Sequence, residues 1–132
     1  MNHRLTIAVH AETYAICRLA ASERVPEWAT GSTFLTITKT ANELSIVCEE
    51  KNVPGEVHAE RKRRLMQVEG TLAFSLTGIL ASVTKPLAEE AISIFAVSSY
   101  DTDYLLVSED DLERAIAVLE AAGHAIRRSG QD

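Results

Sequence analysis

The alternation of apolar and polar positions predicts a helix followed by two strands between residues 75 and 107. In the first part, apolar residues recur at near-helical spacing: Ile79, Leu80, Val83, Leu87 and Ala91. From residue 92 to residue 97 the pattern changes to the period of two that is typical of a strand. The polar segment 98–103 then separates this strand from the apolar run 104–107. Helix, strand, turn and strand is the simplest interpretation.

The C-terminal region carries a second helix pattern. One apolar stripe consists of Leu112, Ala115, Ile116, Leu119 and Ala122. Ser108 is placed to cap this helix, and the acids at 109–111 suit the positive end of its dipole. Gly123 is expected to end the helix, after which residues 124–128 return as an edge strand.

A strand over residues 65–69, ending at Gly70, completes a βαββαβ unit that begins at Arg64. Residues 70–78 form the loop from this strand into the first helix. Pro86 conflicts with a straight helix, because it has no N–H to donate to the carbonyl of Ser82 and disfavours helical geometry at Lys85. We therefore expect a kink or a break there.

The first half of the chain is predicted to be mainly β-structure. Residues 4–10 and 14–19 alternate like two strands, and the short link between them suits a hairpin. Pro26 fits the first turn of a short helix, where Trp28 is expected to anchor the turn onto the sheet rather than to contact a ligand. Residues 34–39 and 43–49 form two further strands, joined by a turn at 40–42.

Residues 49–62 have dense charge, Pro54 and Gly55 but no apolar period, so they are predicted to be a linker. The chain is accordingly divided into an N-terminal half, 1–62, and a C-terminal half, 63–132. The basic run 61–64 has two interpretations: a patch for nucleic acid or an acidic partner, or a solvated linker end that enters a strand. The second is favoured, because four cations without interleaved aromatic residues are a poor nucleic-acid footprint.

Composition narrows the range of functions. The 132 residues fit one ordinary domain or two very small ones, and 46% hydrophobic against 24% charged residues is typical of a globular protein. A formal charge of −6 argues against nucleic-acid binding. No apolar run is long enough to span a bilayer, and the polar-apolar alternation begins at once, leaving no room for a signal peptide. A cytoplasmic protein without membrane contact is expected.

Candidate chemistry is sparse. Cys17 and Cys48 each lie in strand-like apolar runs, so two buried, reduced thiols are expected. The four histidines are scattered, and neither a metal site nor a cofactor is predicted. No nucleophile–base pairing or phosphate-binding glycine loop is recognisable, so catalysis is not expected.

Three segments together resemble the ACT domain: residues 77–81 (TGILA), 92–98 (ISIFAVS) and 101–107 (DTDYLLV). The resemblance is to the small bacterial ACT proteins related to the CASTOR arginine sensors. It implies an α+β fold of two tandem ACT-like, ferredoxin-like βαββαβ halves, the first with a reduced helical part. It also implies a homodimer, since ACT proteins commonly set such domains side by side.

In ACT domains the ligand lies beside the loop that leads into the first helix. The matching candidates here are Ser75, Leu76, Thr77, Gly78 and Ile79. Free N–H groups and hydroxyls at a helix start attract a carboxylate, and glycine allows a close approach to the backbone. The alternative is that Thr77 only caps the helix and that Gly78 only permits packing.

The polar segment after the second strand supplies the other candidates, Ser99, Asp101, Thr102 and Asp103. A carboxylate here could hold an ammonium or guanidinium group through a charge-assisted hydrogen bond. The alternative is a structural turn in which Asp101 bonds to its own backbone. The two roles are compatible.

The sequence therefore predicts a non-catalytic regulatory protein that binds a small amino acid or related metabolite at an interface between ACT domains. The principal alternative is an ACT module that has no ligand and acts through protein contacts. A small α+β enzyme is a third and weaker interpretation.

Overall fold

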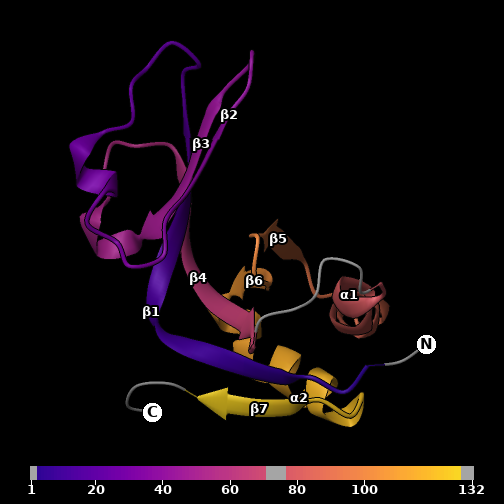
Figure 1. The fold of residues 1–132 in the computed structure, drawn as a ribbon. Helices are drawn as coiled ribbons and strands as arrows, with labels where there is room; N and C mark the ends of the chain where they lie inside the picture. Colours follow the sequence, from indigo (N-terminus) through magenta and orange to yellow (C-terminus); the bar gives the residue numbers. More distant parts are fainter. Residues whose placement is uncertain (1–2, 71–76, 129–132) are drawn as a thin grey trace. The chain divides into compact units, whose positions relative to one another are not determined.

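The computed structural model describes residues 3–70 and 77–128. Within these residues the chain forms an α+β arrangement of strands and two α-helices (Figure 1). In chain order the elements are β1 (Thr6–Leu19), β2 (Thr36–Lys39), β3 (Leu44–Glu49), β4 (Ala59–Val68), α1 (Ile79–Glu89), β5 (Ile94–Ser98), β6 (Asp103–Ser108), α2 (Leu112–Ala121) and β7 (Ala125–Arg128).

Packing divides the chain into two compact units. One contains Met1–Ala11 together with Arg64–Asp132, and the other contains Glu12–Arg63. The first eleven residues thus pack with the C-terminal part, because the first half of β1 pairs with β7 whereas its second half pairs with β3. Strands β1 and β4 contribute residues to both units.

The predicted hairpin between residues 10 and 14 is wrong, because β1 is a single strand of 14 residues. The segment Ala11-Glu12-Thr13 lacks the glycine, asparagine or proline that a tight turn favours. Each end of the strand also has a partner, since Ile7 pairs with Ile126 and Cys17 pairs with Ile46. Cross-strand hydrogen bonding at both ends keeps the strand extended through its middle.

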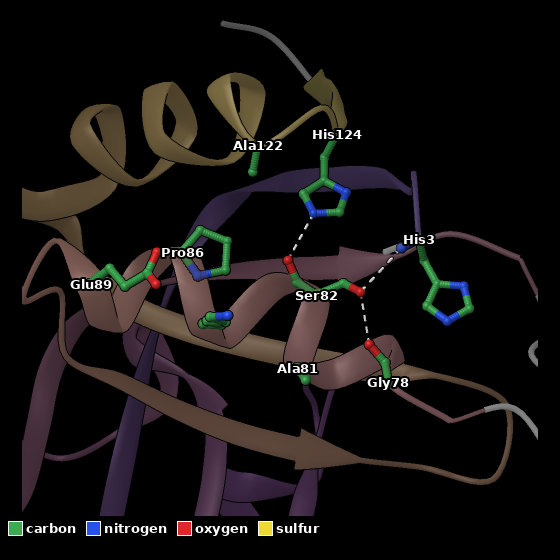
Figure 2. A pocket seen from close by; sticks show the side chains of 9 residues that line it. His3, Gly78, Ala81, Ser82, Pro86, Glu89, Ala122 and His124 are labelled. Carbon is green, nitrogen blue, oxygen red and sulfur yellow. Dashed lines mark hydrogen bonds between the residues drawn. The ribbon is translucent and has the colours of Figure 1, made fainter. Parts of the chain in front are cut away.

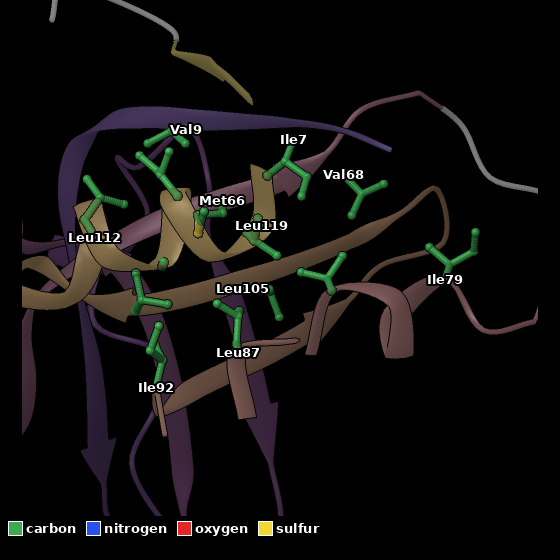
Figure 3. Close-up of a cluster of buried hydrophobic side chains, with 14 residues drawn as sticks. Ile7, Val9, Met66, Val68, Ile79, Leu87, Ile92, Leu105, Leu112 and Leu119 are labelled. Atoms are coloured by element: carbon green, nitrogen blue, oxygen red, sulfur yellow. The ribbon is translucent and has the colours of Figure 1, made fainter. Parts of the chain in front are cut away.

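The larger unit has the strand order β7–β1–β4–β6–β5. Strand β7 is parallel to β1 and closes the edge next to it, whereas β5 and β6 form an antiparallel hairpin. The elements from β4 onward follow the predicted order of strand, helix, strand, strand, helix, strand. Apolar side chains from both helices and from the sheet form the core shown in Figure 3. Its members include Ile7, Val9, Met66, Leu87, Leu105 and Leu119.

Helix α1 continues through Pro86 as far as Glu89, so the predicted break is wrong. Buried Val83 and Leu87 hold the helix against the core on both sides of the proline. Ala91 follows with a positive φ of 58°. The N–H of Ala91 donates to the carbonyl of Ala88, and that of Ile92 donates to Leu87. These two bonds form a Schellman motif, which normally places glycine at the position of Ala91.

Helix α2 ends as predicted, but its own N-cap is Asp111, and Ser108 caps the 3₁₀ turn Glu109–Asp111 that precedes it. The hydroxyl of Ser108 accepts a hydrogen bond from the N–H of Asp110 at 3.3 Å, in a short 3₁₀ turn that leads into the helix. Gly123, with a φ of 102°, ends it with the same Schellman pattern as α1. Strand β7 follows directly, as predicted.

The predicted linker over residues 49–62 is wrong in its bounds. It contains a 3₁₀ turn at Glu50–Asn52, and β4 already begins at Ala59. The basic run therefore lies within a strand. The Arg61 side chain donates to the carbonyls of Pro54 and Val57, at 2.9 and 3.1 Å, while Arg64 donates to the carbonyl of His10 at 2.8 Å. These guanidinium groups hold the backbone, which is why the strand tolerates them.

The smaller unit pairs β2, β3, β1 and β4 in that order. The predicted turn at 40–42 is present, where the Thr40 hydroxyl accepts from the N–H groups of Asn42 and Glu43. Trp28 packs against a core that contains Cys17 and Cys48, so its predicted anchoring role is confirmed. Both cysteines are buried, free thiols, as expected. The contact with Cys17, followed by burial, raises the pKa of the Cys48 thiol.

Tyr14 is the largest fully buried side chain of the smaller unit, with 1% of its surface exposed. Its ring meets the ring of Phe34 edge-on, with centroids 5.8 Å apart. Burial, reinforced by the carboxylates of Glu12 and Glu49, raises the pKa of Tyr14 to about 12. The phenol is therefore neutral at physiological pH.

Candidate functional site

The predicted loop into α1 is described only at its end. Ser75 and Leu76 lie outside the described residues, whereas Thr77 and Gly78 are exposed and Ile79 is buried in the core. Gly78 has a φ of 79° and is the N-cap of α1, so the N-cap residue itself offers no side-chain hydrogen bond to the helix start. The alternative in which Thr77 is the N-cap is therefore wrong. The first N–H groups of the helix lie next to a residue without a side chain.

The predicted acidic cluster forms the turn between β5 and β6. The N–H of Ser99 donates to the carbonyl of Thr102 at 2.9 Å, and the hydroxyl of Ser99 donates to the same carbonyl at 3.2 Å. Ser99, rather than Asp101, thus closes the turn. The carboxylate of Asp103 accepts a hydrogen bond from the hydroxyl of Ser98 at 2.5 Å, and Asp101 is exposed.

Thr102 connects this turn to the strand that leads into the predicted loop. Its side chain is only 5% exposed, and its hydroxyl donates to the carbonyl of Val68 at 2.8 Å. Val68 is the last residue of β4, two positions before Gly70. Val68 also shares a core cluster with Ile79. The acidic turn is therefore anchored beside the place where the predicted loop begins.

Sequence reasoning missed a cavity of about 470 Å³ beside α1 (Figure 2). Its lining comes from three segments that are distant in sequence. These are the segment near the N-terminus with His3, the α1 flank with Gly78, Ser82 and Lys85, and the turn after α2 with His124. Of the predicted site residues that the structure describes, Gly78 alone belongs to this lining.

Hydrogen bonds fix the wall of this cavity around Ser82 (Figure 2). The Ser82 hydroxyl donates to the carbonyl of Gly78 at 2.7 Å and accepts from the N–H of His3 at 3.4 Å. The carbonyl of Ser82 is the group that Pro86 leaves without a helical donor, and it lies 2.9 Å from Nε2 of His124. Because Nδ1 of His124 accepts from the N–H of Leu5, the proton is on Nε2, which donates to Ser82.

The lining of the cavity includes two opposite charges, Lys85 and Glu89. Both side chains are exposed and lie four residues apart on α1, which places them on one face of the helix. Within the described part of the chain, neither forms an ion pair with another residue. The site can therefore present one donor cation and one acceptor anion to a ligand.

One signal in the sequence pointed to this region. Pro86 within a helical pattern implies that the carbonyl four residues earlier needs a donor from elsewhere. The donor, His124, is 42 residues away from Ser82, and no local pattern identifies it.

In residues 3–70 and 77–128, no group of three or more histidine, cysteine or acidic side chains is placed to hold a metal ion. None of the described helices combines the length and the apolar character needed to cross a membrane.

Comparison with known proteins identifies the class. An ACT domain model matches residues 59–121, and a separate model of an N-terminal domain matches residues 12–56. Residues 59–121 belong to the ACT domain family, and the chain is related to the CASTOR arginine sensors. The resemblance of the three motif segments is thereby confirmed.

Among curated relatives, the rat protein named cytosolic arginine sensor for mTORC1 subunit 1 is 31% identical over 117 residues. The match covers 75% of this chain but only 35% of the rat protein, so the chain spans about a third of that relative. A human protein, CASTOR3P, is 33% identical over 92 residues, which cover 60% of this chain and 56% of that protein.

Two solved structures support the fold. A protein from Agobacterium tumefaciens superimposes with a TM-score of 0.92 at 40% identity, covering 98% of this chain and 96% of that one. The regulatory subunit of aspartate kinase from Thermus flavus gives a TM-score of 0.64 at 10% identity, covering 91% and 99% respectively. The second likeness shows that the α+β, ACT-like fold is shared with a regulatory subunit.

Proposed function

We propose that this chain is a non-catalytic regulatory protein that binds a free amino acid or a related metabolite between the loop into α1 and the turn at 99–103. The observation that carries this function is the hydrogen bond from the buried Thr102 hydroxyl to the carbonyl of Val68. It anchors the acidic turn beside the start of the predicted loop, and so supports a site with both a carboxylate-binding and a cation-binding part.

A zwitterion needs both parts. The N–H groups that follow Gly78, which receive no side-chain hydrogen bond from this N-cap residue, would receive the ligand carboxylate together with the Thr77 hydroxyl. Asp101 or Asp103 would receive the ammonium group or a side-chain cation. Either part alone would leave one charge of a desolvated ligand unpaired, which is unfavourable.

The chemistry of the relatives is consistent with this proposal. Proteins named as arginine sensors match three quarters of the chain, and a regulatory subunit shares its fold. The net charge of −6 favours a cationic or zwitterionic ligand over a phosphorylated one. We further propose that the protein acts in the cytoplasm, is not an enzyme, and forms a homodimer in which two copies complete the interface.

The two-half organisation is part of the same proposal. In it, residues 1–62 are an ACT-like half with few helical residues, and residues 63–132 are a complete ACT domain. The two family models, at 12–56 and 59–121, meet close to this boundary. The division into compact units differs from this boundary in sequence, because the first eleven residues pack with the C-terminal part. An exchange of the N-terminal strand between halves is compatible with both facts.

A thermal-shift screen with the common free amino acids tests the proposed ligand. A ligand at about a hundred times its Kd should add roughly 2.7 kcal/mol to the free energy of unfolding. Thr77→Ala and Asp103→Ala should reduce this response but leave the unliganded melting temperature nearly unchanged. Asp110→Ala is a matched control, since that exposed carboxylate lies outside the site. If no amino acid raises the melting temperature at millimolar concentration, the amino-acid proposal fails.

The second candidate is a protein-interaction module without a small ligand. It is favoured by two exposed rings on the β5–β6 hairpin, because Tyr100 is 81% and Phe95 is 38% exposed. Light scattering of the wild type and of Phe95→Ser tests it. A dimer that the substitution dissociates, in a protein that no amino acid stabilises, would support this candidate over the first.

A further inference from the structure

We infer that the cavity beside α1 is a second binding site, for a small molecule whose carboxylate and ammonium groups stand about one helical turn apart, ~6 Å. The site lies on the flank of α1 that faces His3 and His124 (Figure 2). Among the described residues, Gly78 is the one that this site shares with the loop and acidic turn of the proposed function. Its volume of about 470 Å³ is in the range of small-molecule sites, about 300–1,000 Å³.

The wall of the cavity is preformed. His124 is only 5% exposed and bonds at both ring nitrogens, to the N–H of Leu5 and to the carbonyl of Ser82. His3 bonds through its backbone to Ser82 and through its ring Nε2 to the carbonyl of Thr77, at 2.8 Å. These bonds tie the N-terminal segment and the turn after α2 to the same side of α1. The backbone and the two histidines therefore need little rearrangement on binding, and the main ordering cost falls on the exposed side chains of Lys85 and Glu89.

The charges give the site its chemistry. Lys85 and Glu89 lie one turn apart along α1, on the wall of the cavity. Lysine four residues before glutamate is the less favourable order for an ion pair within a helix. No ion pair between them is formed. Both charges are thus available, and a ligand that carries the opposite charge at each end satisfies them together.

Other ligand classes fit less well. A phosphate would be repelled by Glu89, and a metal cation would be repelled by Lys85. The hydroxyl proton of Ser82 is already donated to Gly78, so Lys85 is the principal donor for a ligand carboxylate. Ala81, Pro86 and Ala122 line the remaining wall and suit the methylene chain between the two charged ends.

Titration of ¹⁵N-labelled protein with 5-aminopentanoate, followed by amide chemical shifts, tests this site. The two charges of this probe are separated by about one helical turn, ~6 Å. The amides that shift should belong to residues 78–89 and 122–124. Pentanoate and pentylamine each carry only one of the charges, so they should bind more weakly. Glycine, whose charges are too close together, should also bind more weakly.

Variants locate the contacts. Lys85→Gln and Glu89→Gln should each weaken 5-aminopentanoate binding by up to about fivefold, as expected for exposed ion pairs. Glu90→Gln is the matched control, because this neighbouring exposed carboxylate does not line the cavity, and its affinity should equal that of the wild type. Binding should also weaken as the salt concentration rises.

Three results would overturn the site. One is the absence of amide chemical-shift changes in residues 78–89 and 122–124 when the 5-aminopentanoate concentration is about ten times a Kd of about 1 mM. Another is equal binding of pentylamine and 5-aminopentanoate, and the third is unchanged affinity in both charge variants. Shifts confined to residues 99–103 would indicate that the probe binds at the acidic turn, which supports the proposed function and contradicts the second site. The two proposals therefore fail separately.

Discussion

His124 donates its ring Nε2–H to the carbonyl of Ser82 at 2.9 Å, and this carbonyl is the one that Pro86 deprives of its helical donor. A side chain just after α2 thus replaces a missing backbone bond in the middle of α1. This substitution explains how a helix of 11 residues continues past an internal proline. The side chain of His124 therefore connects α1 to the segment between α2 and β7.

A double-mutant cycle tests this relationship. His124→Ala in the wild type should lower the free energy of unfolding by about 1–3 kcal/mol, because it leaves the Ser82 carbonyl and the Leu5 N–H without partners. In the Pro86→Ala background the same change should be milder by about 1 kcal/mol, since residue 86 again has an N–H for Ser82. His124→Ala removes the hydrogen bond from Leu5 in both backgrounds, so this loss cancels in the coupling free energy. Urea denaturation of the four proteins measures the coupling.

Additive effects of His124→Ala and Pro86→Ala on the free energy of unfolding would contradict this relationship. If the two changes add to within about 0.3–0.5 kcal/mol, His124 does not replace the missing helical donor. His58→Ala provides a control in the other compact unit, and its effect should be the same in both backgrounds.

The two α-helices end in the same motif with different residues, and this offers a matched pair of tests. Ala91 after α1 and Gly123 after α2 both have positive φ, 58° and 102°. Ala91→Gly should raise the free energy of unfolding by up to about 1 kcal/mol, because glycine removes the strain that a Cβ causes in this region. Gly123→Ala should lower it by about 1 kcal/mol. A new Cβ there would lie 3.8 Å from Arg4 Nε, an ordinary contact, so the effect reports backbone strain.

Thermal or urea unfolding measures both effects. A loss of stability in Ala91→Gly would contradict the assignment of strain to Ala91. It would mean that the lost chain entropy of glycine outweighs the relief.

Local patterns predicted much of the larger unit. The stripe from Leu112 to Leu119, the cap at Ser108 and the stop at Gly123 are all set by neighbours in sequence, and each is present. Strands β5 and β6 pair where two strands were predicted, although β5 begins at Ile94 rather than at Ile92. These elements were predictable because their periodicity and their end signals agree.

The errors occurred where distant residues decide the structure. Strand β1 passes straight through the predicted hairpin because β7 and β3 pair with its two ends, and neither partner is adjacent in sequence. The start of β4 was missed because arginines occupy positions in which their guanidinium groups bond to backbone carbonyls. The cavity depends on the contact between Ser82 and His124, 42 residues apart. Sequence patterns with short periods contain no information on such contacts.

Tyr14 should make the protein sensitive to alkali. Its pKa is raised to about 12 in the folded state, chiefly by burial, against about 10 in an unfolded chain. Between these values the unfolded state loses the phenolic proton while the folded state keeps it, so stability falls as the pH rises. The contribution is fully present below pH ~10 and falls by on the order of 2–3 kcal/mol by pH ~12.

Urea denaturation at a series of alkaline pH values measures this loss. Tyr14→Phe removes the ionisable phenol, so its stability should fall less steeply above pH ~10. Tyr100→Phe, at a position that is 81% exposed, is the control and should retain the wild-type slope. An unchanged slope in Tyr14→Phe would show that another group causes the alkaline transition.

Substitutions of Thr102 distinguish an anchoring role from direct ligand contact. The residue is buried, and its hydroxyl is already hydrogen-bonded to the carbonyl of Val68. Thr102→Val preserves the shape of the side chain but leaves the Val68 carbonyl unpaired, so stability should fall by about 1 kcal/mol. The stabilising effect of a bound amino acid should also fall, because the acidic turn is no longer held beside the loop. Thr102→Ser keeps the hydroxyl and should restore most of both properties. The affinity of each variant for the amino acid found in the thermal screen, measured by calorimetry, tests this prediction. If Thr102→Val binds as tightly as the wild type, the ligand does not depend on this turn, and the acidic residues 101 and 103 are removed from the proposed site.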